Sequence, residues 1–258
     1  MIARILSAAL IPCLLLPACS RHQPHGSGAG TILLEEDGSP FVAFNVWIRC
    51  GSSDDPPGKE GLASLTAAFL GGSATRSRSY EEILDRLYPM AADYAVSVDK
   101  EMTNFTGFIH EDNLDRYYDL FRETILAPAF DQGDFERVRS RTLDRLRYAR
   151  RYADDEELCR ELLYREIYRG TPYEHPVDGY VSSVESITLE DVQSFYARNY
   201  TRDNITVAVG GAFPAGFPEK MRKDYDALPA GRPADGPKPL PVPVQGIHVL
   251  LVEKDTDS

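Results

Sequence analysis

The sequence predicts an α+β domain in which helices pack against a mixed, mostly antiparallel sheet. Three observations predict this class. Residues 41–50 alternate apolar and other side chains with a period of two, as a half-buried strand does. Residues 94–98 and 102–110 form a strand pair around a polar turn at 99–101. Several longer stretches space their apolar residues as helices do.

Length and composition agree with a folded domain. The chain has 258 residues, of which 43% are hydrophobic, and this is ample for a core. Its formal charge of −12 makes nucleic acid an unfavourable partner, because phosphates would be repelled. We expect the globular domain to cover residues 31–228.

The first 18 residues predict a secretory signal peptide. Arg4 precedes an apolar run that is too short to span a membrane, and small residues follow it. Leu16 to Cys19 resembles the bacterial lipobox, which implies lipidation at Cys19, although Pro17 departs from the usual small residue and leaves an ordinary signal peptide open. We therefore expect a periplasmic lipoprotein that is anchored in a membrane, with residues 19–30 as a flexible tether.

Two cysteines remain in the mature body. Cys50 and Cys159 could pair in an oxidising periplasm, but one possible pair is no disulfide framework, and two buried free thiols are an equal alternative.

The first strands are expected at 31–34 and 41–50, around a turn at Asp37-Gly38. One face of the second strand is apolar, through Val42, Phe44, Val46 and Ile48. Trp47 lies on the opposite face, which predicts that this face is covered as well.

The stretch 51–77 is a turn followed by a short apolar helix. The Asp-Asp-Pro-Pro-Gly sequence at 54–58 sets the turn, and the helix is expected at 62–70, ending at Gly71-Gly72. Its Ser64, Ala67 and Ala68 share one face of small side chains.

Further helices are expected along the rest of the chain. Ser79 caps a helix that ends before Pro89, and helices at 111–126, 134–152 and 155–168 follow the hairpin. Seven arginines between 137 and 151 are typical of a solvated helix face. A capping box from Thr188 to Asp191 starts another helix, which leads into an apolar strand at 205–209.

The C-terminal part differs in composition. Residues 229–244 are rich in proline, glycine and alanine, which predicts a semi-rigid linker. Residues 245–253 are expected to begin another strand, so that 245–258 would be the truncated start of a second, similar domain.

Three segments, in order, resemble the pitrilysin/insulinase family of zinc peptidases. These are the turn and helix at 51–72, the loop TPYEHPVDG at 171–179, and the run at 187–211 that begins ITLEDV and ends NITVAVGG. The resemblance covers roughly residues 31–228 and implies the α+β fold of insulinase and mitochondrial-processing-peptidase domains.

The resemblance implies a zinc site whose residues are missing here. In the family, an H-x-x-E-H helix supplies two zinc ligands and the general base, and a later Glu supplies the third ligand. The matching positions hold Ser64, Ala67 and Ala68, and the family's spacing places the third ligand at Arg145, with Val138 where a second acidic residue precedes it. None of these residues ligates zinc in the family's way, so we expect no cofactor here, with zinc confined to active relatives. His175 is an isolated histidine, so we expect it to lie at the surface or to contact a metal ligand instead of the metal itself.

The hairpin at 94–110 is the second site that the resemblance implies. In the family, the equivalent edge strand binds the substrate peptide as an added strand. Here that segment is Ala95, Val96, Ser97 and Val98, without the family's Asn. An ordinary edge hairpin without a ligand remains the alternative.

The preferred hypothesis is a non-catalytic insulinase-like subunit that binds a peptide or unfolded polypeptide and pairs with an active subunit or second domain. Two alternatives stay open: a divergent active zinc metalloendopeptidase with other ligands, and a purely structural subunit.

Overall fold

The computed structural model describes residues 30–36, 38–152, 155–231, 240–241, 243 and 245–251. The expected signal peptide, Cys19 and nearly all of the tether lie outside these residues, as does most of the linker. No helix in the described part of the chain is long and apolar enough to cross a membrane.

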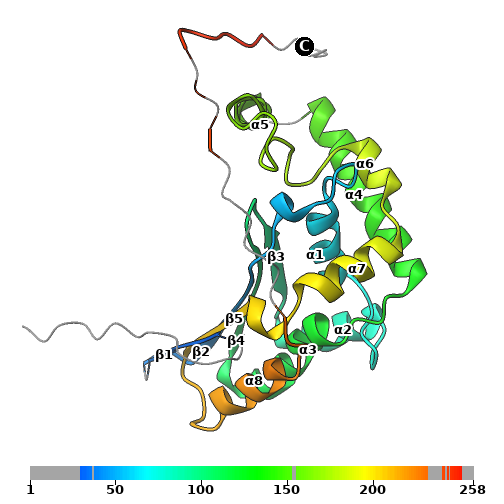
Figure 1. Ribbon diagram of the computed structural model, residues 1–258. Helices are drawn as coiled ribbons and strands as arrows, with labels where there is room; N and C mark the ends of the chain where they lie inside the picture. The colour runs from blue at the N-terminus through cyan, green and yellow to red at the C-terminus, as the bar shows by residue number, and fades with distance from the viewer. Residues whose placement is uncertain are drawn as a thin grey trace, which may run out of the picture.

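A single five-stranded sheet organises the fold (Figure 1). Its strands are β1 (Gly30–Glu35), β2 (Phe41–Ile48), β3 (Tyr94–Val98), β4 (Thr103–His110) and β5 (Ile205–Gly211). They lie in the order β1-β5-β2-β4-β3, and every pairing is antiparallel except the parallel pair of β1 and β5. The predicted α+β class with a mixed, mostly antiparallel sheet is confirmed.

Helices cover one face of this sheet (Figure 1). They are α1 (Leu62–Gly71), α2 (Tyr80–Leu87), α3 (Leu114–Leu126), α4 (Gln132–Tyr152), α5 (Asp155–Ile167), α6 (Val181–Ser186), α7 (Leu189–Asn199) and α8 (Phe217–Asp226). Helix α1 contacts β3 on one side and α4 and α7 on the other, so it lies between the sheet and the outer helices.

The core forms where the apolar face of β2 meets α3. Phe44 packs its ring against Tyr117, Tyr118 and Phe121, with ring centroids 5.6–5.9 Å apart. Burial of such large apolar surfaces is the main stabilising contribution to a fold of this size. The predicted inward face of β2 is confirmed, because Val42, Phe44, Val46 and Ile48 are all buried.

The opposite face of the sheet is covered only in part by the described residues. Trp47 is half-buried there, but Phe41 and Phe108 stack on each other and remain exposed. Cover over this face, which Trp47 led us to expect, is therefore incomplete within the part of the chain that the structure describes.

Local signals located most helix ends correctly. Ser79 and Thr188 accept hydrogen bonds from the backbone N–H groups of Glu82 and Asp191, as the two capping boxes require. Helix α8 was not predicted, although Phe217, Met221 and Tyr225 recur at four-residue spacing and are buried. That periodicity was the available signal.

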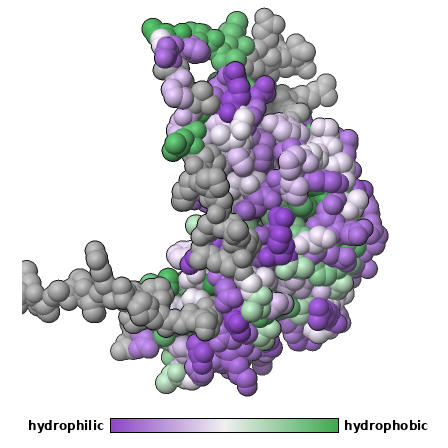
Figure 2. Space-filling view, viewed as in Figure 1, coloured by the Kyte–Doolittle hydropathy of each residue, from purple (hydrophilic) through white to green (hydrophobic). Residues whose placement is uncertain are grey.

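The described C-terminal residues differ from the expectation. Residues 245–251 form no strand, and Ile247 and Leu251 are 94% and 83% exposed. In Figure 2 apolar side chains gather at the top of the molecule, where this part of the chain lies in Figure 1. A strand needs the hydrogen bonds of a neighbouring strand, and no described strand pairs with this segment.

Candidate functional site

The N-terminal end of helix α1 is positioned by a half-buried carboxylate, that of Asp55. Asp55 accepts hydrogen bonds from the backbone N–H groups of Gly61 and Ala63, each 2.7 Å long. These are two of the donors that a helix leaves without an intrahelical partner at its N-terminus. Asp55 thus holds residues 55–61, the entry loop that leads into α1, against the first turn of this helix.

The loop at 171–179 closes over this entry loop through two glycines. Gly61 and Gly179 both have positive φ, and a Cβ atom on Gly179 would lie 1.9 Å from the carbonyl oxygen of Glu60. Ser183 fixes the same contact by donating to that oxygen at 2.7 Å. This close approach of two backbones places Asp178 beside the first turns of α1.

Asp178 joins Ser64 and Arg145, two of the positions that the sequence resemblance assigns to zinc ligands. The hydroxyl of Ser64 donates to Oδ1 of Asp178 at 2.5 Å, and Nη2 of Arg145 lies 3.0 Å from the same oxygen. We call these three residues the Asp178 bridge. It connects α1, α4 and the loop at 171–179, so residues far apart in sequence meet at one carboxylate.

The side chains at this place do not fit a zinc ion. Ser64 is 8% exposed and its hydroxyl is engaged by Asp178, while Ala67 is buried and offers no donor atom. Arg145 brings a cation to the place of a carboxylate ligand, which would repel the metal. Within the described ranges no group of three His, Cys, Asp or Glu side chains could hold a metal ion.

The residues predicted for peptide binding lie on β3, at one edge of the sheet. Ala95 and Ser97 are exposed, and Val96 and Val98 are half-buried. Asp99 donates its N–H to the carbonyl of Met102 across the turn, so alternation along the ladder leaves the backbone N–H and C=O groups of Tyr94, Val96 and Val98 facing away from β4. No strand in the described part of the chain pairs with these groups, so among these residues they form an open edge for an added strand.

A pocket of about 290 Å³ opens between this edge strand and the helices. We call it the arginine pocket. Its lining comes from α1, α2, β3 and α4: Ala68, Gly71, Gly72, Tyr80, Tyr94, Val96, Val138, Arg141, Thr142 and Arg145. A second, separate pocket of about 450 Å³ is lined by Val98, Asp178 and residues of α5.

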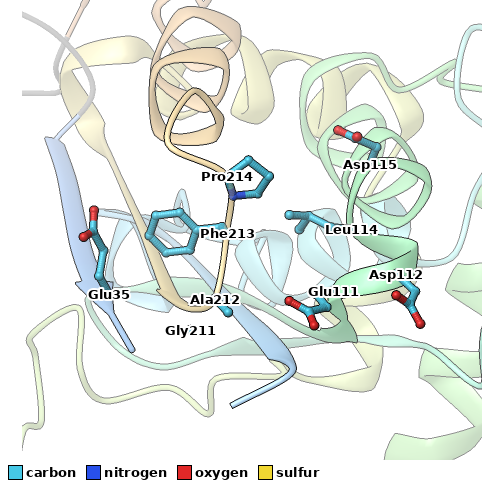
Figure 3. A pocket seen from close by; sticks show the side chains of 9 residues that line it. All are labelled: Glu35, Glu111, Asp112, Leu114, Asp115, Gly211, Ala212, Phe213 and Pro214. Atoms are coloured by element: carbon cyan, nitrogen blue, oxygen red, sulfur yellow. The ribbon is translucent and has the colours of Figure 1, made fainter. Parts of the chain in front are cut away.

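An acidic pocket of about 340 Å³ lies elsewhere, near the end of β5. Figure 3 shows the carboxylates of Glu35, Glu111, Asp112 and Asp115 spread around Phe213 and Pro214 instead of converging on one point. None of the positions that match the family's zinc site contributes to it.

The remaining candidate residues are His175 and the two cysteines, Cys50 and Cys159. His175 is half-buried, and burial lowers its pKa, so its imidazole is mostly neutral at pH 7. Cys50 and Cys159 are both free, the first buried and the second exposed. The two cysteines therefore form no disulfide with each other. The expectation that both thiols are buried is wrong for Cys159, which is exposed.

Asp55 predicts a pH dependence of stability. Burial raises the pKa of Asp55 from 3.8 to about 7, against the opposing effect of its two N–H donors. Between these two pH values the folded state binds more protons than the unfolded state, so the contribution of Asp55 to stability falls as the pH rises from 4 to 7. Asp55→Asn keeps an acceptor oxygen but cannot ionise.

We therefore expect the stability of Asp55→Asn relative to the unmodified protein, measured by urea unfolding, to be higher at pH 7.5 than at pH 5. Asp55→Ala is the control, since it loses the acceptor at both pH values. A difference between the Asn variant and the unmodified protein that does not change with pH would contradict this role of burial.

Comparisons with known proteins agree with this geometry. The family model of insulinase, peptidase family M16, matches residues 31–179. An uncharacterized zinc protease of Mycobacterium leprae (strain TN) is 26% identical over 170 residues, which are 66% of this chain and 38% of that protein. The β subunit of the mitochondrial-processing peptidase of Dictyostelium discoideum is 19% identical over 181 residues, 70% of this chain and 38% of that protein.

Solved structures show the same fold. An inactive M16 peptidase domain from Pseudomonas fluorescens superposes with a TM-score of 0.75 at 24% identity, over 84% of this chain and 53% of that one. Pitrilysin gives a TM-score of 0.70 at 16% identity, over 84% of this chain and 24% of that one. The chain therefore spans well under half the length of the curated relatives it matches. Since the family model matches more than half of the sequence, this chain belongs to the insulinase family, peptidase family M16.

Proposed function

We propose that this protein is a non-catalytic member of its family, which binds a peptide or unfolded polypeptide at β3 and works with an active insulinase-like subunit or second domain. One observation carries the proposal. The positions of the zinc ligands and the general base hold Ser64, Ala67, Ala68 and Arg145, and Asp178 bridges the first and last of them.

The chemistry of these positions supports loss of catalysis. A zinc ion lowers the pKa of its bound water to about 7, far below that of bulk water. A side chain without an ionisable group at position 67 cannot take the proton of that water. The Asp178 bridge instead links α1 and α4 by a hydrogen bond and an ion pair, which supports a structural role for the positions assigned to the zinc site.

The open edge of β3 supports peptide binding without any metal. An added strand gains hydrogen bonds from the outward backbone groups of Tyr94, Val96 and Val98, whatever its own sequence. The family's Asn is not needed for these bonds. One structural relative, a ferredoxin protease with a TM-score of 0.71 at 18% identity over 81% of this chain and 24% of that one, was solved in complex with Arabidopsis ferredoxin.

A partner and a location complete the proposal. The curated relatives are more than twice as long as the matched region, which supports a second domain or subunit in the working assembly. The lipobox-like sequence before Cys19 supports a periplasmic lipoprotein anchored in a membrane. If Cys19→Ala leaves membrane association in a bacterial host unchanged, the lipid anchor is wrong.

Peptide binding at the edge can be tested by removing one backbone donor. Val96→Pro deletes an N–H that faces away from β4, so the β3–β4 ladder stays intact. Loss of a hydrogen bond and of close strand approach should weaken binding of an extended peptide roughly tenfold. Fluorescence polarisation with a labelled nine-residue peptide measures the change.

Val96→Ala is the matched control, because it shortens the side chain but keeps the N–H. It should bind within about threefold of the unmodified protein, since a net hydrogen bond is worth about 1 kcal/mol and this variant loses none. Equal weakening by both variants would show that the side chain matters and not the strand edge. Absence of binding of any extended peptide to the unmodified protein would overturn the proposed function.

A further inference from the structure

The structure points to a carboxylate-binding site in the arginine pocket. We propose that this pocket binds a carboxylate of the peptide that lies along β3, either an acidic side chain or a free C-terminus. The inference rests on the proposed peptide binding and adds the chemical class of the preferred ligand.

The position of the pocket connects it to the peptide. Tyr94 and Val96 of β3 line it, and the same two residues turn backbone groups toward the open edge of the sheet. A Cβ atom on Gly71 would lie 2.8 Å from a methyl group of Val96, so the end of α1 packs closely on this strand. A peptide paired with β3 therefore passes beside the pocket.

Two arginines contribute to its wall. Arg141 and Arg145 are four residues apart on α4, and so they lie on the same face of the helix one turn apart. Arg145 pairs with Asp178 at 3.0 Å. Arg141 is exposed and has no ion pair or side-chain hydrogen bond with any residue that the structure describes.

Arg137 offsets the negative C-terminal end of α1, so this end of the helix does not repel an anion in the pocket. The carbonyl oxygen of Gly72, just past α1, carries part of the negative end of the helix dipole. Arg137 donates to that oxygen at 2.6 Å and also pairs with Asp134. Arg137 is thus already occupied, and Arg141, the next arginine on the same face, is left for a ligand.

The rest of the lining favours an anion as well. No aspartate or glutamate lines the pocket, whereas the hydroxyl-bearing Tyr80 and Thr142 do. A guanidinium group presents paired N–H donors in a plane, and a carboxylate accepts two of them at once. The pocket is small, so it suits one carboxylate on a short side chain or chain end.

The overall charge of the protein acts in the opposite direction. Its formal charge of −12 repels acidic peptides at long range. Charges separated by more than about 8 Å are largely screened at physiological ionic strength, so contact with Arg141 outweighs the distant carboxylates. The preference for a carboxylate should therefore be clearest at moderate salt.

Four versions of one nine-residue peptide test the site on the purified protein. They carry either Glu or Gln at the central position, and end in either a free carboxylate or an amide. We expect at least one carboxylate-bearing version to bind about tenfold or more tightly than the Gln amide version, as a charge-assisted hydrogen bond pair would provide. The position that gives the gain identifies side chain or C-terminus as the source.

Arg141→Gln should abolish this preference and leave binding of the Gln amide peptide unchanged. Arg116→Gln is the matched control, because Arg116 is an exposed arginine of α3 that does not line the pocket. Thermal melting checks that both variants remain folded. Equal binding of all four peptides, or an undiminished preference in Arg141→Gln, would overturn the carboxylate site while peptide binding itself stands. If no version binds, the proposed function fails as well.

Discussion

Gly179→Ala should destabilise the protein by roughly 3 kcal/mol, as large clashes and backbone strain do. The added Cβ atom would lie 1.9 Å from the carbonyl oxygen of Glu60, and the backbone of Gly179 is at φ +72°. Neither atom can move without separating the loop at 171–179 from the entry to α1. Asp178 would then lose its position beside Ser64. Urea unfolding measures the loss of stability.

Gly170→Ala separates strain from clash. Gly170 also has a positive φ, of 76°, but no atom lies within 4 Å of its added Cβ. This control should cost only about 1 kcal/mol, the ordinary cost of a left-handed conformation for a residue with a Cβ. If the two variants are equally stable, the close backbone contact does not hold the loop in place.

The second large effect is the recovery of a metal site. Ser64→His, Ala67→Glu, Ala68→His and Arg145→Glu, combined in one variant, should bind about one zinc per chain. Positions 64 and 68 share a face of α1, and the Asp178 bridge shows that position 145 lies near position 64. Two imidazoles and a carboxylate are the ligand set that a catalytic zinc site of this kind uses.

Stability provides an independent readout for this variant. Arg145→Glu places a second carboxylate near Asp178, so the combined variant should be less stable than the unmodified protein when no metal is present. Zinc at 100 times its dissociation constant should restore about 2.7 kcal/mol. Any one of the four substitutions alone should show no zinc-dependent shift in melting temperature. Failure of the combined variant to bind zinc would mean that the backbone no longer holds the family's ligand geometry.

Local sequence patterns predicted the elements better than their pairing. The alternation of β2, the capping boxes at Ser79 and Thr188 and the β3–β4 hairpin all depend on residues within a few positions of one another. Strand β1 follows no such rule, because it pairs in parallel with β5 and not with β2, its neighbour in sequence. Nothing in residues 30–35 specifies a partner so distant along the chain.

The candidate site shows the same limit. Family resemblance placed Ser64 and Arg145 at ligand positions, but no pattern pointed to Asp178, which is 114 residues from Ser64 in sequence. The pairing depends on the close approach of Gly61 and Gly179 in three dimensions. The arginine pocket was likewise not predicted, because the arginines of α4 have the composition of an ordinary solvated face.

Metal analysis of the purified, unmodified protein tests the central claim most directly. After exposure to zinc and removal of free metal, the account predicts no stoichiometric zinc and no cleavage of unstructured peptides above background, because Ser64, Ala68 and Arg145 supply no ligand set for the ion. One tightly held zinc per chain, lost on chelation together with peptidase activity, would contradict the account.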